Sequence, residues 1–180
     1  MKARPAFVAV VLAVLPLAVV AVSAGSATAD SGGTAATVTV TPGALTITVP
    51  ATADALASGV SSVNGSTISG SLGQVHVSDA RGAAAGSGWV TTVISTAFTP
   101  PAGPTIGAAA VGYVAGSIAK VGTATYTANN PTALGGAVAA VTATGITGQN
   151  SATWTPTINI ALLGSTAANT YTGTITHSVT

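Results

Sequence analysis

The chain contains no cysteine, so no disulfide holds its fold together and no thiolate can serve as a nucleophile or metal ligand. Charged residues make up only 4% of the 180 residues, and aromatic residues another 4%. A globular protein ordinarily has roughly 25% charged residues. So little charge excludes a chain that stays unfolded through self-repulsion. The abundant residues are Gly, Ala, Thr, Ser and Val, which favour strands and tight turns over long helices.

Basic residues are scarce beyond the N-terminus. The formal charge of +1 includes two basic residues within the first four positions. Residues 30–180 carry Arg81 and Lys120 against aspartates at positions 30, 54 and 79, so their formal charge is 2 − 3 = −1. Each contact with a phosphate backbone needs a lysine or an arginine. Nucleic acid is therefore not expected as a partner.

The N-terminus has the three parts of a secretory signal peptide. Two basic residues precede an apolar run over residues 6–22, and a stretch of small residues ends in Ala27-Thr28-Ala29. The alternative is a membrane anchor, but the run has 17 residues with Pro16 inside it, and a spanning helix needs about 20. We therefore expect residues 1–29 to form a signal helix that is cleaved after Ala29. The mature chain is expected to be exported and free of the membrane.

A short polar leader at residues 30–36 is followed by segments in which apolar and small polar residues alternate, as in half-buried strands. The clearest segments are residues 37–41, 44–49 (with Leu45, Ile47 and Val49 inward), 123–127, 151–162 and 171–179. Pro156 predicts an edge strand or a bulge, because proline cannot donate to a ladder. Residues 99–104, with three prolines, predict a connection within one domain. About ten short strands predict an all-β fold over residues 37–180, an antiparallel β-sandwich of Ig-like or Greek-key type.

The most distinctive residues lie between positions 74 and 93. Residues 74–78 predict a strand, Asp79 and Arg81 lie in an expected turn, and residues 83–88 form an expected loop. Trp89 opens the next predicted strand. In a chain so poor in charged and aromatic residues, these side chains are expected to fix the centre of the fold.

Four pieces of sequence together carry a resemblance to a known family: residues 45–50 (LTITVP), 77–90 (VSDARGAAAGSGWV), 150–154 (NSATW) and 170–179 (TYTGTITHSV). On them the chain resembles the WxL domain, a cell-wall-binding surface module of Gram-positive bacteria, in its actinobacterial form. The likeness covers residues 37–180. It departs from the family pattern at Thr91, where a leucine is usual, and at His177, where tryptophan is usual. The resemblance implies a secreted, non-catalytic protein of the cell surface that binds peptidoglycan or another wall glycan and displays itself or partner proteins there.

Asp79 and Arg81 are candidate ligand-binding residues. An arginine offers a planar fork of donors and an aspartate accepts, so the two could hydrogen-bond a glycan or a peptide stem. In the structural alternative they pair with each other or cap backbone amides and so hold residues 83–88 in place. The structural alternative is favoured. If a ligand binds here, it is expected over residues 83–88.

Trp89 and Trp154 complete the candidate ligand-binding set, because an indole face suits the apolar face of a sugar. Alternation places Trp154 on the same face as Ile158 and Ile160, which favours a place in the core. For Trp89 the alternation allows either face. Burial is favoured for both, since an indole buries a large apolar area.

No catalytic residue, metal or other cofactor is predicted. His76 is expected to face solvent and His177 to be a buried, hydrogen-bonded imidazole, and two histidines without a third ligand make a poor zinc site. Two further interpretations stay open beside wall binding. One is a wall-acting hydrolase with Asp54 and Asp79 as its carboxylate pair. The other is an adhesin or a structural subunit of a surface assembly, which would associate with other surface proteins by strand addition.

Overall fold

The computed structural model describes residues 33–53, 56, 59 and 62–180. The predicted signal peptide at residues 1–29, Asp30 and Asp54 lie outside these residues. The chain divides into a unit spanning Met1–Thr39 and a compact unit spanning Val40–Thr180. Within the described residues, no helix is long and apolar enough to cross a membrane.

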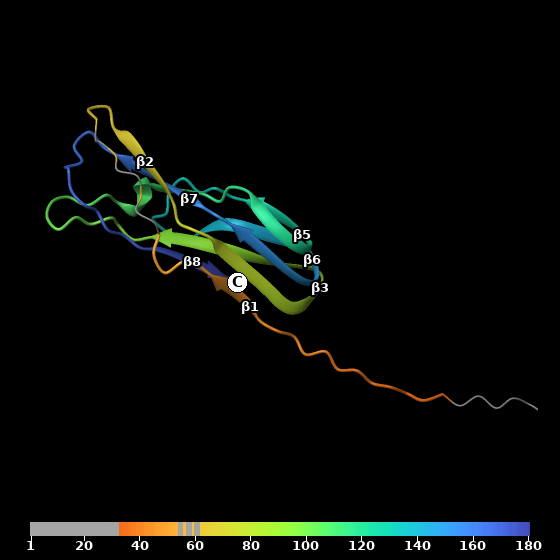
Figure 1. The fold of residues 1–180 in the computed structure, drawn as a ribbon. Coiled ribbons are helices and arrows are strands. Elements are labelled where there is room, and N and C mark those ends of the chain that lie inside the picture. Colours follow the sequence, from red (N-terminus) through yellow and green to blue (C-terminus); the bar gives the residue numbers. More distant parts are fainter. Residues whose placement is uncertain (1–32, 54–55, 57–58, 60–61) are drawn as a thin grey trace, which may run out of the picture. The chain divides into compact units, whose positions relative to one another are not determined.

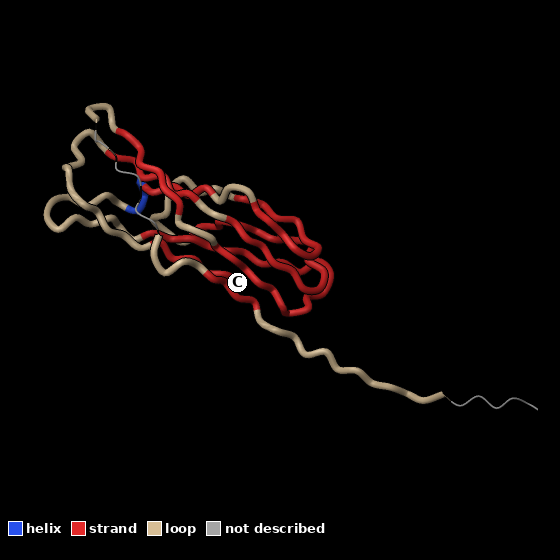
Figure 2. The backbone as a smooth tube through the Cα atoms, in the orientation of Figure 1, coloured by secondary structure: helices blue, strands red, loops and turns tan. Residues whose placement is uncertain are grey.

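The compact unit is all-β and antiparallel, which confirms the predicted fold class (Figure 2). The described residues contain eight strands where about ten were expected. They are β1 (Leu45–Thr48), β2 (Ser66–Ser71), β3 (Val75–Ser95), β4 (Val111–Val114), β5 (Ile118–Ala128), β6 (Val138–Trp154), β7 (Thr157–Leu162) and β8 (Ile175–Val179). A 3-10 turn, η1 (Ala108–Ala110), precedes β4.

The strands form two sheets (Figure 1). The larger sheet has five strands in the order β1-β3-β6-β5, with β8 also pairing with β3. β1 pairs with the first half of β3 and β8 pairs with its second half. The smaller sheet has three strands in the order β2-β7-β4.

The strand β3 folds back on itself in the middle. The Arg81 side chain donates to the carbonyl of Gly88, seven residues later, at 3.2 Å. Seven residues of straight strand span about 23 Å, which is beyond the reach of an arginine side chain. The pairing of β3 with β6 shifts register between Asp79 and Trp89, and the pairing of β5 with β6 shifts register between Val121 and Thr125. We call this bent region, residues 80–88 with the facing parts of β5 and β6, the corner.

Glycine permits the corner. Five glycines with positive φ lie there, a conformation that other residues rarely adopt. They are Gly82, Gly86, Gly122, Gly145 and Gly148. The prediction of a turn at residues 79–81 and a loop at residues 83–88 was therefore wrong in form. All of these residues belong to β3, and the reversal of direction is made within a bulged strand.

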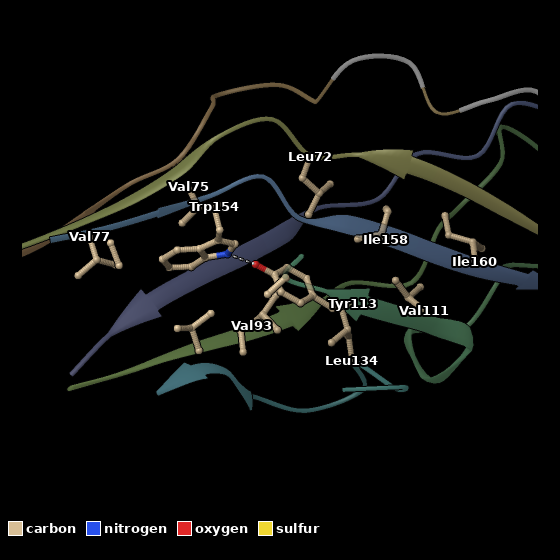
Figure 3. Close-up of a cluster of buried hydrophobic side chains, with 14 of the residues drawn as sticks. Leu72, Val75, Val77, Val93, Val111, Tyr113, Leu134, Trp154, Ile158 and Ile160 are labelled. Carbon is tan, nitrogen blue, oxygen red and sulfur yellow. Dashed lines mark hydrogen bonds between the residues drawn. The ribbon is translucent and has the colours of Figure 1, made fainter. Parts of the chain in front are cut away.

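The core lies between the layers and receives side chains from both halves of β3. Val75 and Val77 come from the first half and Val93 from the second, and Figure 3 shows them around Trp154 and Tyr113. All five side chains are at most 2% exposed. One apolar core thus holds the folded-back sheet and the smaller sheet together.

The alternation predicted over residues 151–162 is confirmed, although the segment is two strands. The buried positions are Ala152, Trp154, Pro156, Ile158, Ile160 and Leu162. Pro156 lies between β6 and β7, where the chain leaves the larger sheet for the smaller one. The edge-strand prediction for this segment was wrong, because β7 is the central strand of its sheet and β6 has neighbours on both sides. Proline is tolerated because it lies between two ladders.

Two predictions near the start of the fold were wrong. Residues 37–41 form no strand, and Val38 and Val40 are 87% and 84% exposed. Val49 lies beyond the end of β1 and is 40% exposed, so it does not face inward with Leu45 and Ile47. The alternating pattern was present in both places, but a strand also needs a neighbouring ladder, and β1 has one only over Leu45–Thr48.

Candidate functional site

Asp79 and Arg81 form a bidentate ion pair, as the structural interpretation expected. Arg81 Nε donates to Asp79 Oδ1 at 2.9 Å, and Arg81 Nη2 donates to Asp79 Oδ2 at 2.9 Å. The backbone N–H of Arg81 also donates to Oδ1 at 3.1 Å. Side chains two residues apart lie on the same face of a strand, which explains the pairing. The carboxylate has no exposed side-chain surface, whereas 36% of the Arg81 side chain is exposed.

Asn150 joins this ion pair to two aromatic side chains. Its Nδ2 donates to Asp79 Oδ2 at 3.2 Å. Its Oδ1 accepts from Trp89 Nε1 at 3.0 Å and from the Tyr126 hydroxyl at 3.1 Å. The Trp89 and Tyr126 rings are tilted against each other with centroids 5.7 Å apart. We call the five residues Asp79, Arg81, Trp89, Tyr126 and Asn150 the corner network.

The corner network is suited to keeping Asp79 and Arg81 as an ion pair rather than to proton transfer. The side-chain hydrogen bonds from Arg81 outweigh desolvation and lower the pKa of Asp79 to about 2. Burial raises the pKa of Tyr126. Among the described residues, no buried side-chain nitrogen or oxygen lacks a hydrogen-bond partner. The network therefore leaves no free polar atom for a ligand in its interior, and it fixes the bend of the sheet.

The sequence predictions had missed Asn150 and Tyr126. Asn150 is two residues before Ala152 and four before Trp154, so alternation along β6 places it on the inward face. A polar residue at an inward position signals a buried hydrogen-bond partner. That signal was present in the sequence, but its partners come from β3 and β5 and could be found only from the fold.

A second set of hydrogen-bonded side chains lies in the core around Tyr113. Trp154 Nε1 donates to the Tyr113 hydroxyl oxygen at 2.8 Å, and that oxygen lies 3.2 Å from His177 Nε2 (Figure 3 draws the Trp154 bond). A hydroxyl can donate one hydrogen bond and accept two, so Tyr113 either donates to His177 Nε2 or accepts from it, according to which ring nitrogen of His177 carries the hydrogen. Burial lowers the pKa of His177 to about 4 and raises the pKa of Tyr113 to about 12. The predicted hydrogen bond of His177 is confirmed, whereas its predicted burial is only partial, because the side chain is half-buried and lines a cleft described below.

We expect His177 to make the protein lose stability as the pH falls from 6.5 to 4. The folded state keeps the imidazole neutral down to a pKa of about 4, whereas the unfolded chain binds a proton at about 6.5. Stability is therefore complete above pH 6.5 and falls as the unfolded state takes up that proton, by about 3 kcal/mol in total. Urea unfolding between pH 7.5 and 4 measures this change.

His177→Gln provides the comparison, because glutamine can accept from Tyr113 but does not titrate. The free energy of unfolding of this variant is expected to change by less than about 1 kcal/mol over the same pH range. His76→Gln is the matched control. His76 Nδ1 lies 2.9 Å from Thr153 Oγ1 at a half-buried position, and this variant is expected to keep the wild-type acid sensitivity. Equal pH profiles for wild type and His177→Gln would contradict the assignment.

Two clefts lie apart from the corner, since none of residues 80–88 lines either of them. The larger cleft has a volume of about 830 Å³, and its lining includes Phe98, Ile160, Leu162, Thr166, Asn169 and Tyr171. The smaller cleft has a volume of about 470 Å³ and shares Phe98 and Tyr171 with the larger one. His177 lines the smaller cleft. No charged side chain of the described residues lines either cleft.

The four predicted ligand-binding residues do not form one surface site. Trp89 and Trp154 are each 2% exposed and Asp79 is 1% exposed, so none offers a face to a sugar. Arg81 alone of the four reaches solvent. Asp79, Arg81 and Trp89 meet at the corner, whereas Trp154 bonds to Tyr113 in the core. No group of three potential metal ligands occurs among the described residues.

Comparison of the chain with protein-family models, with curated proteins and with solved structures gave no match in any of the three. Function must therefore be inferred from the residues and from the geometry of the corner network and the clefts.

Proposed function

We propose that the chain is an exported, non-catalytic surface protein that binds the bacterial cell wall non-covalently, as a WxL-like domain does, and that the larger cleft holds the wall ligand. The observation that supports this proposal is that the described residues lining that cleft are all uncharged. Its volume of about 830 Å³ is within the usual range for a small-molecule site. Uncharged lining residues suit an uncharged glycan or a short apolar peptide better than a phosphate or a nucleic acid.

The polar groups of the larger cleft support the same proposal. Tyr171 contributes an aromatic ring, while Asn169 and Thr166 contribute an amide and a hydroxyl. Aromatic rings bind the apolar faces of sugars, and amides and hydroxyls bind their hydroxyl groups. The rest of the lining is mostly apolar, with Phe98 as a second ring and Ser62 and Thr170 as further hydroxyls, which is typical of a site that binds by shape with a few orienting polar groups.

The state of Asp79 supports a non-catalytic role over a wall hydrolase. A glycosidase needs one carboxylic acid whose raised pKa lets it donate a proton. Asp79 has its pKa lowered to about 2 and both of its oxygens bonded to Arg81. It is therefore ionised and occupied at any physiological pH. Release of wall fragments by the wild-type chain, abolished in Asp79→Asn, would favour the hydrolase.

Co-sedimentation with isolated wall sacculi tests the proposal. The chain from residue 30 onward is expected in the pellet, and Tyr171→Ala is expected to weaken binding by about tenfold, because loss of a ring contact removes about 1.4 kcal/mol. Val121→Ala, at a 69% exposed position that lines neither cleft, is the control and should bind as wild type does. Thermal unfolding of each variant verifies that its fold is intact.

Two results would overturn parts of the proposal. If the wild-type chain stays in the supernatant across pH and salt, wall binding fails. If Arg81→Lys loses binding while Tyr171→Ala keeps it, the ligand lies at the corner, where the exposed part of the Arg81 side chain is. Lysine keeps the charge but cannot make the bidentate contact.

A further inference from the structure

Residues 37–41 have the pattern of a strand and no ladder in which to pair. The segment reads Thr-Val-Thr-Val-Thr, all β-branched residues that favour strands. The structure assigns it no strand, and its two valines, Val38 and Val40, are 87% and 84% exposed. A strand in this position would expose its apolar side chains to water, and its backbone N–H and C=O groups would have no partners in a ladder.

The corner explains why the chain does not pair this segment with β3. The ladder between β1 and β3 ends at the hydrogen bond from Gly43 N to Ala80 O, at 2.9 Å. Immediately beyond Ala80, β3 bends at Gly82, where φ is +62°. Pro42 also removes one backbone donor at this point. Residues before Pro42 are therefore left without the neighbour that β1 has.

An acceptor edge is present on β5 (Ile118–Ala128). Among the described residues β5 pairs with β6 alone, so its other side is an open sheet edge. It is 11 residues long, the longest of the strands with an open side, since β1, β2, β4 and β8 have four to six residues. Lys120 and the register shifts of its ladder with β6 between Val121 and Thr125 protect its first part against pairing, as charges and irregularities do on edge strands. Residues 125–128 pair with β6 in an unbroken register and carry no charge.

The inward side chains of residues 123–128 are incompletely covered. Ala124, Tyr126 and Ala128 pack against the core but are only half-buried, while Thr123, Thr125 and Thr127 are exposed. A strand added at this edge with the pattern of residues 37–41 would place its valines beside the half-buried side chains and its threonines beside the exposed threonines. Aliphatic–aromatic and Thr–Thr neighbours of this kind stabilise sheets.

We propose that residues 37–41 of one copy add as a strand to residues 123–128 of β5 in a second copy. The proposal goes beyond wall binding and does not depend on it. A formal charge of −1 for residues 30–180 gives little repulsion between copies. Because the segment and the edge are different surfaces, the interface is heterologous, and a pair of copies keeps one free segment and one free edge. Such contacts build chains of subunits unless the geometry closes a ring.

Sedimentation velocity on the chain from residue 30 onward tests the proposal. Residues 6–22 are left out because that apolar run would associate by itself. Wild type is expected to form concentration-dependent oligomers. Thr39→Pro and Val40→Pro are tested separately, because neighbouring N–H groups point to opposite sides of a strand, so one of the two prolines removes a ladder bond in any register. At least one of them should be monomeric, and the control Ala35→Pro should associate as wild type does.

Single-cysteine variants then identify the edge, and the cysteine-free chain makes the result unambiguous. An oxidised mixture of Thr39→Cys and Thr125→Cys is expected to form a disulfide-linked heterodimer, and a mixture of Thr39→Cys with Thr67→Cys on β2 is not. Any of three results would overturn the proposal: a wild type that is monomeric at all concentrations, equal association of both proline variants and Ala35→Pro, or equal cross-linking to Thr125→Cys and Thr67→Cys. An intrachain disulfide in a monomeric Thr39→Cys/Thr125→Cys double variant would overturn it too, by assigning the pairing to one copy.

Discussion

Replacing Asn150 by aspartate is expected to reduce the free energy of unfolding by about 3 to 5 kcal/mol at pH 7. The change leaves an oxygen that can still accept from Trp89 Nε1 and from the Tyr126 hydroxyl. It replaces the Nδ2 donor, 3.2 Å from Asp79 Oδ2, by a second carboxylate oxygen. Two carboxylates at this distance cannot both be ionised without strong repulsion, and Asn150 is only 5% exposed. Urea unfolding at pH 7 measures the loss.

The pH dependence of this variant identifies the cause. One carboxylate of the new pair has a folded-state pKa above its unfolded value of about 3.9, so the penalty is present above that raised pKa and is relieved as the pH falls through it. The difference in stability between wild type and Asn150→Asp should therefore shrink from pH 7 to pH 4.5. Using the difference removes the effect of His177, which both proteins share. Asn159→Asp, at a half-buried position bonded to Ser69, is the control and should show a small loss that does not shrink.

Gly122→Ala is expected to reduce the free energy of unfolding by about 3 kcal/mol, measured by urea or thermal unfolding. A Cβ at Gly122 would lie 2.5 Å from the Gln149 carbonyl oxygen and 3.1 Å from the Asn150 Cα, so the backbone of β6 would have to move. The φ of +85° adds strain for any residue with a Cβ, of about 1 to 2 kcal/mol. The displaced segment includes Asn150, so the corner network is disturbed as well.

Gly145→Ala separates the two contributions. Gly145 has a φ of +64°, and a Cβ added there would meet no atom within 4 Å, so only the conformational strain applies. A loss of about 1 kcal/mol is expected. If both alanine variants lose the same stability, the close approach of β5 to β6 at the corner does not contribute, and positive φ alone explains the need for glycine.

The fold class and much of the core followed from alternation, because a strand with one buried face shows its apolar side chains every second residue. The alternation of buried and exposed side chains continues through residues 151–162, although the chain passes from the larger sheet to the smaller one within them. Trp154 and Ile158 lie in different strands and different sheets, and both face the same core, at 2% and 1% exposure. Alternation could not predict that the segment is divided into two strands, because a buried Pro156 is equally compatible with a bulge, with an edge strand and with a passage from one sheet to the other.

The corner was harder to predict because its causes are not local. Asp79 and Arg81 followed by Gly82 have the composition of a turn, and residues 83–88 have that of a loop. A strand with bulges can contain residues of both kinds, but only if the neighbouring strands bend together with it. That condition depends on glycines in β5 and β6 that lie more than 30 residues away along the chain. No pattern within the segment carries that information.

The candidate site, too, could be predicted from the sequence only in part. The pairing of Asp79 with Arg81 and the burial of Trp154 depended on spacing and alternation, and both were foreseen. The clefts lie where Phe98, Ile160 and Tyr171 from distant segments converge, and none of these residues is unusual in its own sequence context. The choice of Asp79, Trp89 and Trp154 as ligand-binding candidates followed their rarity in the chain. Rare large side chains in a small-residue sequence are needed first to fill the core.

The backbone hydrogen bonds of Gly43 and Thr180 decide where the domain would be attached to something larger. Gly43 N donates to Ala80 O, and Thr180 exchanges two hydrogen bonds with Val90, so all three bonds flank the corner. A segment joined behind Thr180 therefore starts beside the corner, whereas the larger cleft is lined by residues of β2, β7 and the connection between β7 and β8. A tag, a tether or a fused domain joined there would be attached next to Val90 and not next to Tyr171 and the other residues that line the larger cleft.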